Sequence, residues 1–207
     1  MRTLNKETLL HLTPELALQK LKEGNGRFMN NIKAHHDLLT QVNETSQGQF
    51  PFAAILSCID SRTSAELIFD QGLGDVFSIR IAGNILNQDI LGSMEFACKY
   101  AGSKLIVVLG HTKCGAIESA CNNLQAEGNL PVLLNKIKPA VELETETKEN
   151  RNATNKSFVD NVTSINVHIT VDKIKEQSPL LDAMEKEGKI KIVGGLYDLD
   201  TGKVTFY

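Results

Sequence analysis

Two short segments of the chain combine residue types that bind a soft metal ion. The first is Cys58-Ile-Asp60-Ser-Arg62, and the second is His111-Thr-Lys-Cys114. Zinc prefers cysteine sulfur and histidine nitrogen, and a catalytic zinc site has three protein ligands and leaves the fourth position to water. A His-x-x-Cys pair alone is a weak signal, because this spacing is common by chance. Together with Cys58 it predicts a three-ligand, catalytic type of site.

Asp60 and Arg62 place a carboxylate and a guanidinium directly after the first cysteine. An arginine can hold a carboxylate through two parallel hydrogen bonds, which keeps the carboxylate ionised and oriented. Such a carboxylate can accept a hydrogen bond from metal-bound water, whereas a structural zinc site has no need of it. The alternative is that both residues only cap the following helix, and without the metal ligands we would prefer that interpretation.

The elements that must position these residues follow from the apolar patterning. Strands are expected at 52–57, 76–81, 105–109 and 190–193, and a hairpin at 197–206. Helices are expected at 14–30, 63–70 (from the capping-box spacing of Thr63 and Glu66), 88–100, from 115, 131–148, 155–176 and 179–187, with a polar connection at 31–48. Strands that alternate with helices imply a mainly parallel sheet covered on both faces, with ligand sites beyond the carboxyl ends of the strands. We therefore expect an α/β fold: a central mainly parallel β-sheet of four strands plus a C-terminal edge strand, flanked by helices, with an N-terminal helical arm.

Composition limits the classes of function. The 207 residues carry a formal net charge of -3 and include 42% hydrophobic residues. No cluster of Lys and Arg predicts binding to nucleic acid or to an anionic membrane. The chain has neither an apolar signal-peptide stretch nor a run of about 18 apolar residues, so a cytoplasmic protein is expected. Cys98 and Cys121 lie among apolar neighbours and are interpreted as small buried side chains.

The combination of Cys58-x-Asp60-x-Arg62 with His111-x-x-Cys114 resembles the signature of the β-class carbonic anhydrases. The resemblance extends over most of the chain, including 24–28, 75–84 and 194–204. It implies a lyase that reversibly hydrates carbon dioxide to bicarbonate and a proton. It also implies a single domain over 1–207, with an N-terminal helical arm at 1–48 and an α/β core at 49–207.

The resemblance also implies roles for individual residues. Cys58, His111 and Cys114 become the ligands of one Zn²⁺ per chain, whose bound hydroxide attacks CO2. Asp60 would accept the hydrogen of that hydroxide, and Arg62 would hold Asp60. Because two thiolates cancel the charge of the metal, we expect a weaker Lewis acid than a three-histidine site and activity that rises toward alkaline pH.

Three further residues are assigned on the same basis. Gln49 matches a glutamine that donates to a substrate oxygen, and Gly115 can present its backbone N–H to bound bicarbonate. Tyr100 is a candidate proton relay, although buffer could serve instead.

Some bacterial members of the family keep the counterpart of Asp60 on the zinc as a fourth ligand. That closed state is favoured by a bicarbonate pocket of Trp, Arg and Tyr. Arg80 and Tyr197 match two of these residues, but Ile55 occupies the tryptophan position and the chain contains no Trp. We therefore expect an open resting site, with Asp60 on Arg62.

The family builds its site at a dimer interface, with the N-terminal helix reaching over the partner, so a homodimer or a dimer of dimers (a homotetramer) is implied. Two alternatives stay open. One is a carbon disulfide or carbonyl sulfide hydrolase, which uses the same fold and ligands. The other is a noncatalytic zinc protein, whose metal would be closed by a fourth fixed ligand.

Overall fold

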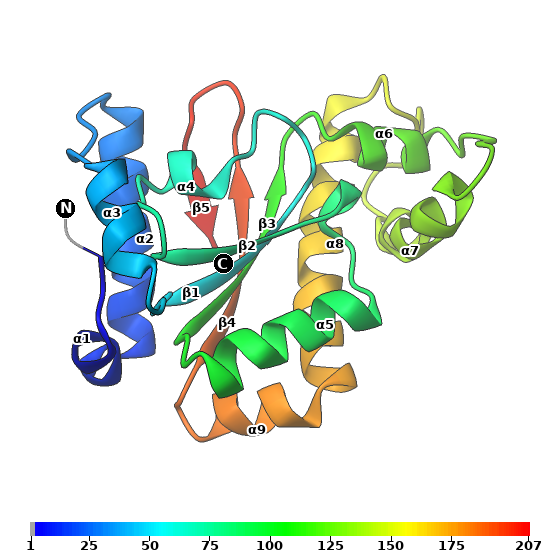
Figure 1. The fold of residues 1–207 in the computed structure, drawn as a ribbon. Helices are drawn as coiled ribbons and strands as arrows, with labels where there is room; N and C mark the ends of the chain where they lie inside the picture. Colours follow the sequence, from blue (N-terminus) through cyan, green and yellow to red (C-terminus); the bar gives the residue numbers. More distant parts are fainter. Residues whose placement is uncertain (1–2) are drawn as a thin grey trace.

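A single sheet organises residues 3–207, the part of the chain that this computed structural model describes. Within those residues the sheet has five strands in the order β2-β1-β3-β4-β5 (Figure 1). They are β1 (Ala53–Ser57), β2 (Val76–Arg80), β3 (Leu105–His111), β4 (Lys191–Tyr197) and β5 (Val204–Phe206). The first four run parallel, and β5 pairs antiparallel with β4. The expected architecture is confirmed.

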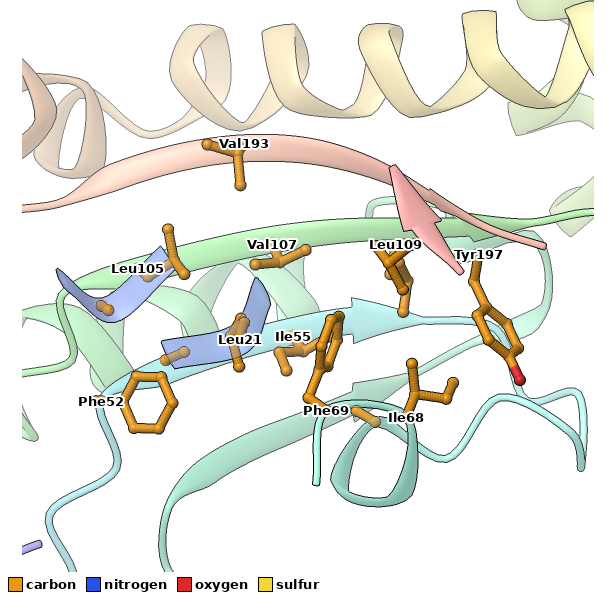
Figure 2. Packing of buried hydrophobic residues seen from close by; sticks show 14 of the residues in the cluster. Leu21, Phe52, Ile55, Ile68, Phe69, Leu105, Val107, Leu109, Val193 and Tyr197 are labelled. Carbon is orange, nitrogen blue, oxygen red and sulfur yellow. The ribbon is translucent and has the colours of Figure 1, made fainter. Parts of the chain in front are cut away.

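The two central strands are mostly apolar and fully buried because helices cover both of their faces. Every residue of β1 and of β3 is buried, as is typical of parallel strands between two helical layers. On one face the sheet packs against α1 (Lys6–His11), α2 (Pro14–Met29) and α4 (Ala65–Ile68). Figure 2 shows Leu21 of α2 with Ile55 and Val107 of the sheet in this layer.

The opposite face of the sheet carries a second apolar layer. It contains α5 (Gln88–Glu95), the π-helical turn η2 (Phe96–Tyr100), α8 (Lys156–Gln177) and α9 (Pro179–Lys186). A third cluster lies beyond the carboxyl ends of the central strands and joins α6 (Gly115–Cys121) and α7 (Leu130–Leu143) to the first part of α8. The short turn η1 (Ala82–Asn84) contacts α6 at this end of the sheet. Figure 1 shows α6 and α7 grouped at this end.

The N-terminal region is more helical than the polar pattern indicates. Residues 31–48 include α3 (Leu38–Thr45), where a connection without regular structure was expected. The side chain of Asp37 accepts the N–H of Thr40 and so caps this helix. The buried Gln41 accepts a hydrogen bond from the Leu73 backbone, which fixes the helix to the core. The large apolar side chains of this helix are exposed, so burial of an apolar face does not account for it, and polar contacts hold it instead.

The helix expected at 63–70 is shorter and starts differently. Its N-cap is Ser64, and α4 covers only four residues. The hydroxyl of Thr63 does not cap the helix but donates to the carbonyl oxygens of Cys58 and Asp60, at 3.1 and 2.9 Å. The capping-box prediction was therefore wrong: Thr63 holds the loop that precedes the helix.

None of the helices within residues 3–207 is long and apolar enough to cross a lipid bilayer.

Candidate metal centre

The two central strands bring the three candidate ligands together. Cys58 directly follows β1, His111 is the last residue of β3, and Cys114 is the N-cap of α6. Because β1 and β3 are adjacent and parallel, their carboxyl ends lie side by side. The ligand atoms of the three side chains all lie within 4.8 Å of one another, and all three residues are buried.

The spacing of these atoms fits a zinc ion. In tetrahedral coordination with Zn–S bonds of about 2.3 Å, two sulfur ligands lie about 3.8 Å apart; the Sγ atoms of Cys58 and Cys114 are 4.0 Å apart. The Nδ1 of His111 lies 2.9 Å from the carbonyl oxygen of Thr112. A donor hydrogen on Nδ1 leaves the Nε2 lone pair free, as in metal-bound histidines. That Nε2 is buried and has no hydrogen-bond partner, so a metal ion would satisfy it.

The two thiols resist being ionised together without a cation. A hydrogen bond from the Cys114 thiol, with a contribution from the Gly83 N–H, lowers the pKa of Cys58 to about 4. The pKa of Cys114 is raised instead, because its thiol donates to Cys58 and because burial disfavours its charge. The pair therefore holds one negative charge easily and a second with difficulty. A divalent cation would stabilise both thiolates, which is the chemistry of a thiolate metal site.

Asp60 and Arg62 form the bidentate pair expected from the sequence. The Arg62 Nε and Nη2 donate to the two carboxylate oxygens of Asp60, at 2.9 and 2.7 Å. These bonds lower the pKa of Asp60 to about 2. Its carboxylate is thus ionised, points to the guanidinium and stands outside the cluster of ligand atoms. This is the geometry of the open site, and the open resting state of the metal-loaded protein stays a prediction.

Arg80 holds the same loop from the other side, a role that the sequence does not reveal. Its Nε donates to the carbonyl oxygen of Cys58 at 3.0 Å, and its Nη2 to that of Asp60 at 2.6 Å. Ile55, at the tryptophan position of the bicarbonate pocket, is buried in β1, and Tyr197 lies at the end of β4 (Figure 2). The guanidinium of Arg80 is therefore engaged in fixing the loop between Cys58 and Asp60.

The loop between the other two ligands is fixed by the hairpin of β4 and β5. The hydroxyl of Thr112 accepts the N–H of Leu199 at 3.0 Å. Lys113 forms an ion pair with Asp200 at the tip of the hairpin. Gly115, the first residue of α6, lies directly beside Cys114, so its backbone is at the site.

Two of the assigned residues lie far from the cluster of ligand atoms in the folded chain. Gln49 is exposed and precedes β1, at the opposite end of that strand from Cys58. Five strand residues cover about 17 Å, several times the reach of a glutamine side chain. Tyr100 ends η2, is 76% exposed and stacks on Phe96. It lies near the amino end of β3, so one chain alone does not bring Gln49 or Tyr100 to the cluster.

Comparisons with known proteins match this geometry. A family model described as "Carbonic anhydrase" matches residues 53–204. The chain is 36% identical to carbonic anhydrase 2 of Mycobacterium tuberculosis, over 92% of this chain and 91% of the relative. It is 34% identical to a carbonic anhydrase of Mycolicibacterium smegmatis, over 92% of each. A solved tetrameric β-carbonic anhydrase from Sordaria macrospora has a similar fold, with a TM-score of 0.71, 23% identity and coverage of 93% of this chain and 94% of that one.

Proposed function

The chain belongs to the β-class carbonic anhydrase family, whose members interconvert carbon dioxide and bicarbonate, and we propose that Cys58, His111 and Cys114 hold the catalytic zinc ion of this enzyme. One observation carries the proposal. Two buried thiols and an unpartnered histidine nitrogen converge within 4.8 Å at the carboxyl ends of adjacent strands. This set offers three soft donors and leaves a fourth position for substrate water, as in a catalytic zinc site.

A zinc ion held by Cys58, His111 and Cys114 would supply a Lewis acid that lowers the pKa of water. The protein residues orient this chemistry. The Thr112 carbonyl fixes the His111 ring, and Gly115 follows Cys114 directly as the first residue of α6. Because Cys58 and Cys114 would both bind the metal as thiolates, the centre would keep little net positive charge, and we expect activity to rise toward alkaline pH.

Asp60 is proposed to orient the nucleophile. Its carboxylate is ionised well below neutral pH and can only accept hydrogen bonds. A hydroxide that donates its hydrogen to Asp60 would direct its lone pair at the carbon of CO2. Arg62 keeps the carboxylate in place and available through the bidentate pair. Asp60 thus acts at the reacting atoms, while Arg62 positions it.

The outer edge of the sheet is proposed as the dimer interface. Strand β2 has a sheet neighbour on one side only. Beside it an open groove of about 760 Å³ is lined by Phe77, Ile79 and Phe96, among others. An unpaired strand with apolar side chains is a template for pairing with another strand. We assign this edge to a second copy of the chain, because a two-fold axis pairs β2 with itself in the antiparallel sense.

This pairing also explains the position of Gln49. Gln49 lines a pocket with Leu73 and Gly74, just before β2 starts, whereas Arg80 at the end of β2 contacts the loop of Cys58. Antiparallel pairing places the start of one strand opposite the end of the other. Gln49 of one subunit would therefore reach the metal centre of its partner. The same pairing would offer Tyr100 a route to the partner's site as a proton relay.

Two further surfaces are proposed to contact other subunits. The N-terminal arm exposes large apolar side chains, such as Ile32 and Leu39, which a partner subunit would cover. The short strand β5 forms the second edge of the sheet and is available for a dimer of dimers. The relative from Sordaria macrospora is described as tetrameric.

Metal analysis tests the proposed ligands. Purified wild-type protein should contain one zinc per chain, and Cys114→Ser should lose most of it. Cys121→Ser is the matched control, because Cys121 is also buried in the third apolar cluster but lies outside the ligand set. Full zinc content in Cys114→Ser would show that the zinc ion is held elsewhere.

A further inference from the structure

The sulfur of Cys58 has a backbone partner in a neighbouring turn. The N–H of Gly83 donates to the Cys58 Sγ, with 3.4 Å between nitrogen and sulfur, in a buried setting. Gly83 belongs to η1 and has φ 67° and ψ 17°, a left-handed conformation that glycine adopts without cost. A Cβ at this position would lie 2.8 Å from the Cδ1 of Ile137 and 3.3 Å from the Cβ of Ala116. The turn can therefore approach the sulfur only because this residue is glycine.

A buried amide on α8 anchors that turn. The Nδ2 of Asn166 donates to the carbonyl oxygen of Gly83 at 3.0 Å, across 83 positions of the sequence. Asn166 is 2% exposed. Asparagine is a poor choice for a helix interior, and a buried amide costs free energy unless it is hydrogen-bonded. The bond to Gly83 therefore satisfies a buried donor that would otherwise destabilise the fold.

We infer that Asn166 is a positioning residue for the metal centre: by holding the Gly83 carbonyl, it keeps the Gly83 N–H on the Cys58 sulfur. This inference rests on the proposed function, because it requires Cys58 to be a metal ligand. An N–H···S hydrogen bond draws electron density from the thiolate, so the sulfur donates less charge to the bound metal. In a site with two thiolates, which weaken the Lewis acid, such a bond would restore part of its strength.

Residues that hydrogen-bond to metal ligands can change the properties of the metal site. Such groups set the orientation and basicity of the ligands. Loss of one of these groups typically lowers metal affinity or activity about 10–100-fold. Asn166 acts at one remove, through Gly83, and touches neither the metal nor the substrate. A packing role alone would change stability and leave the electronic state of the sulfur unchanged.

The test is made on cadmium-loaded full-length protein by NMR. In wild-type protein, ¹¹³Cd should show a through-bond coupling to the amide hydrogen of Gly83, transmitted by the Cys58 sulfur. Asn166→Leu should abolish this coupling, and zinc-loaded Asn166→Leu should lose about tenfold in kcat/KM at full zinc content. Asn161→Leu is the matched control, because Asn161 lies on the same helix and donates to Glu144 instead. It should keep both the coupling and the activity.

The outcomes separate the two hypotheses. Wild-type protein that binds no cadmium or zinc at Cys58 would contradict the proposed function. Metal-loaded wild-type protein without the Gly83 coupling, or an Asn166→Leu variant that keeps it, would overturn the inference while leaving the proposed function intact. If leucine prevents folding, Asn166→Ser removes the long amide donor with less steric change and is measured in the same way.

Discussion

The sharpest prediction concerns which subunit supplies Gln49 to each active site. Gln49 and Cys58 lie at opposite ends of β1, about 17 Å of strand apart, so one chain cannot bring both to one zinc ion. Antiparallel pairing of β2 with its copy would supply Gln49 from the partner. Two inactive variants, Gln49→Ala and Cys58→Ser, should therefore complement each other when they share a dimer.

The activity expected of the mixture follows from the number of intact sites. Loss of one donor to a developing oxyanion typically lowers turnover about 10²–10³-fold, and loss of a zinc ligand abolishes it. Random reassociation of an equal mixture makes about half of the dimers mixed, each with two sites related by symmetry. In a mixed dimer, one site has both defects and the other has none. The mixture should recover about a quarter of the wild-type activity per subunit.

The assay is CO2 hydration after the two variants are dissociated and reassociated together. The control mixture is Asp60→Asn with Cys58→Ser, whose defects lie in the same loop of one chain, so every mixed dimer has two damaged sites. Activity in the first mixture that stays at the mean of the two separate variants would refute the exchange of Gln49 between subunits. A dimer that forms through another edge of the sheet gives that result.

Further predictions concern single positions. Asp60→Asn should lower kcat/KM about 10²-fold with zinc content unchanged, measured by stopped flow. The pKa of Asp60 is lowered to about 2, so its ion pair with Arg62 stabilises the fold above about pH 4 and is lost toward pH 2. Acid unfolding of Asp60→Asn, compared with the wild type, should therefore depend less on pH in that interval. Gly83→Ala should lower the free energy of unfolding by about 2–4 kcal/mol in urea titrations, from its left-handed φ and the contact with Ile137. Burial raises the pKa of Cys98 to about 12, so a thiol reagent at pH 8 should not label it before unfolding.

The strands and the metal cluster follow directly from the sequence. β1 and β3 are apolar runs up to their last residues, so their burial between helices can be predicted from the sequence alone. Because both strands end at chemically distinctive residues, the parallel sheet brings Cys58, His111 and Cys114 together. Their role as zinc ligands stays a prediction. The bidentate pair of Asp60 and Arg62 could also be predicted from the sequence, because the two residues are only two positions apart.

Other features depend on contacts that no local pattern encodes. Helix α3 relies on the Asp37 cap and on polar contacts with distant segments, such as the bond from the Leu73 backbone to Gln41. Thr63 has the spacing of a helix cap but serves the preceding loop, because two carbonyl oxygens of that loop compete for its hydroxyl. The bonds of Arg80 to the same loop likewise join segments that meet only in the folded sheet.

The distance between Gln49 and the cluster has a similar cause. A residue-by-residue match assigns a role without saying which subunit performs it. Only the sheet shows that β1 separates Gln49 from the cysteines of its own chain. If Gln49 acts in the site, as proposed, a symmetry-related chain must supply it, and the order of residues carries no information about that symmetry.

The most direct test of the central claim is stopped-flow CO2 hydration by the zinc-loaded enzyme, scanned from mildly acidic to alkaline pH. The proposed mechanism predicts a rate that rises through one apparent pKa, disappears when zinc is chelated and returns when zinc is restored. An abrupt loss of activity below about pH 8, with an aspartate oxygen in place of water on the metal, would contradict the open arrangement of Asp60. No hydration at any pH, in protein that holds one zinc per chain at Cys58, His111 and Cys114, would contradict the mechanism as a whole.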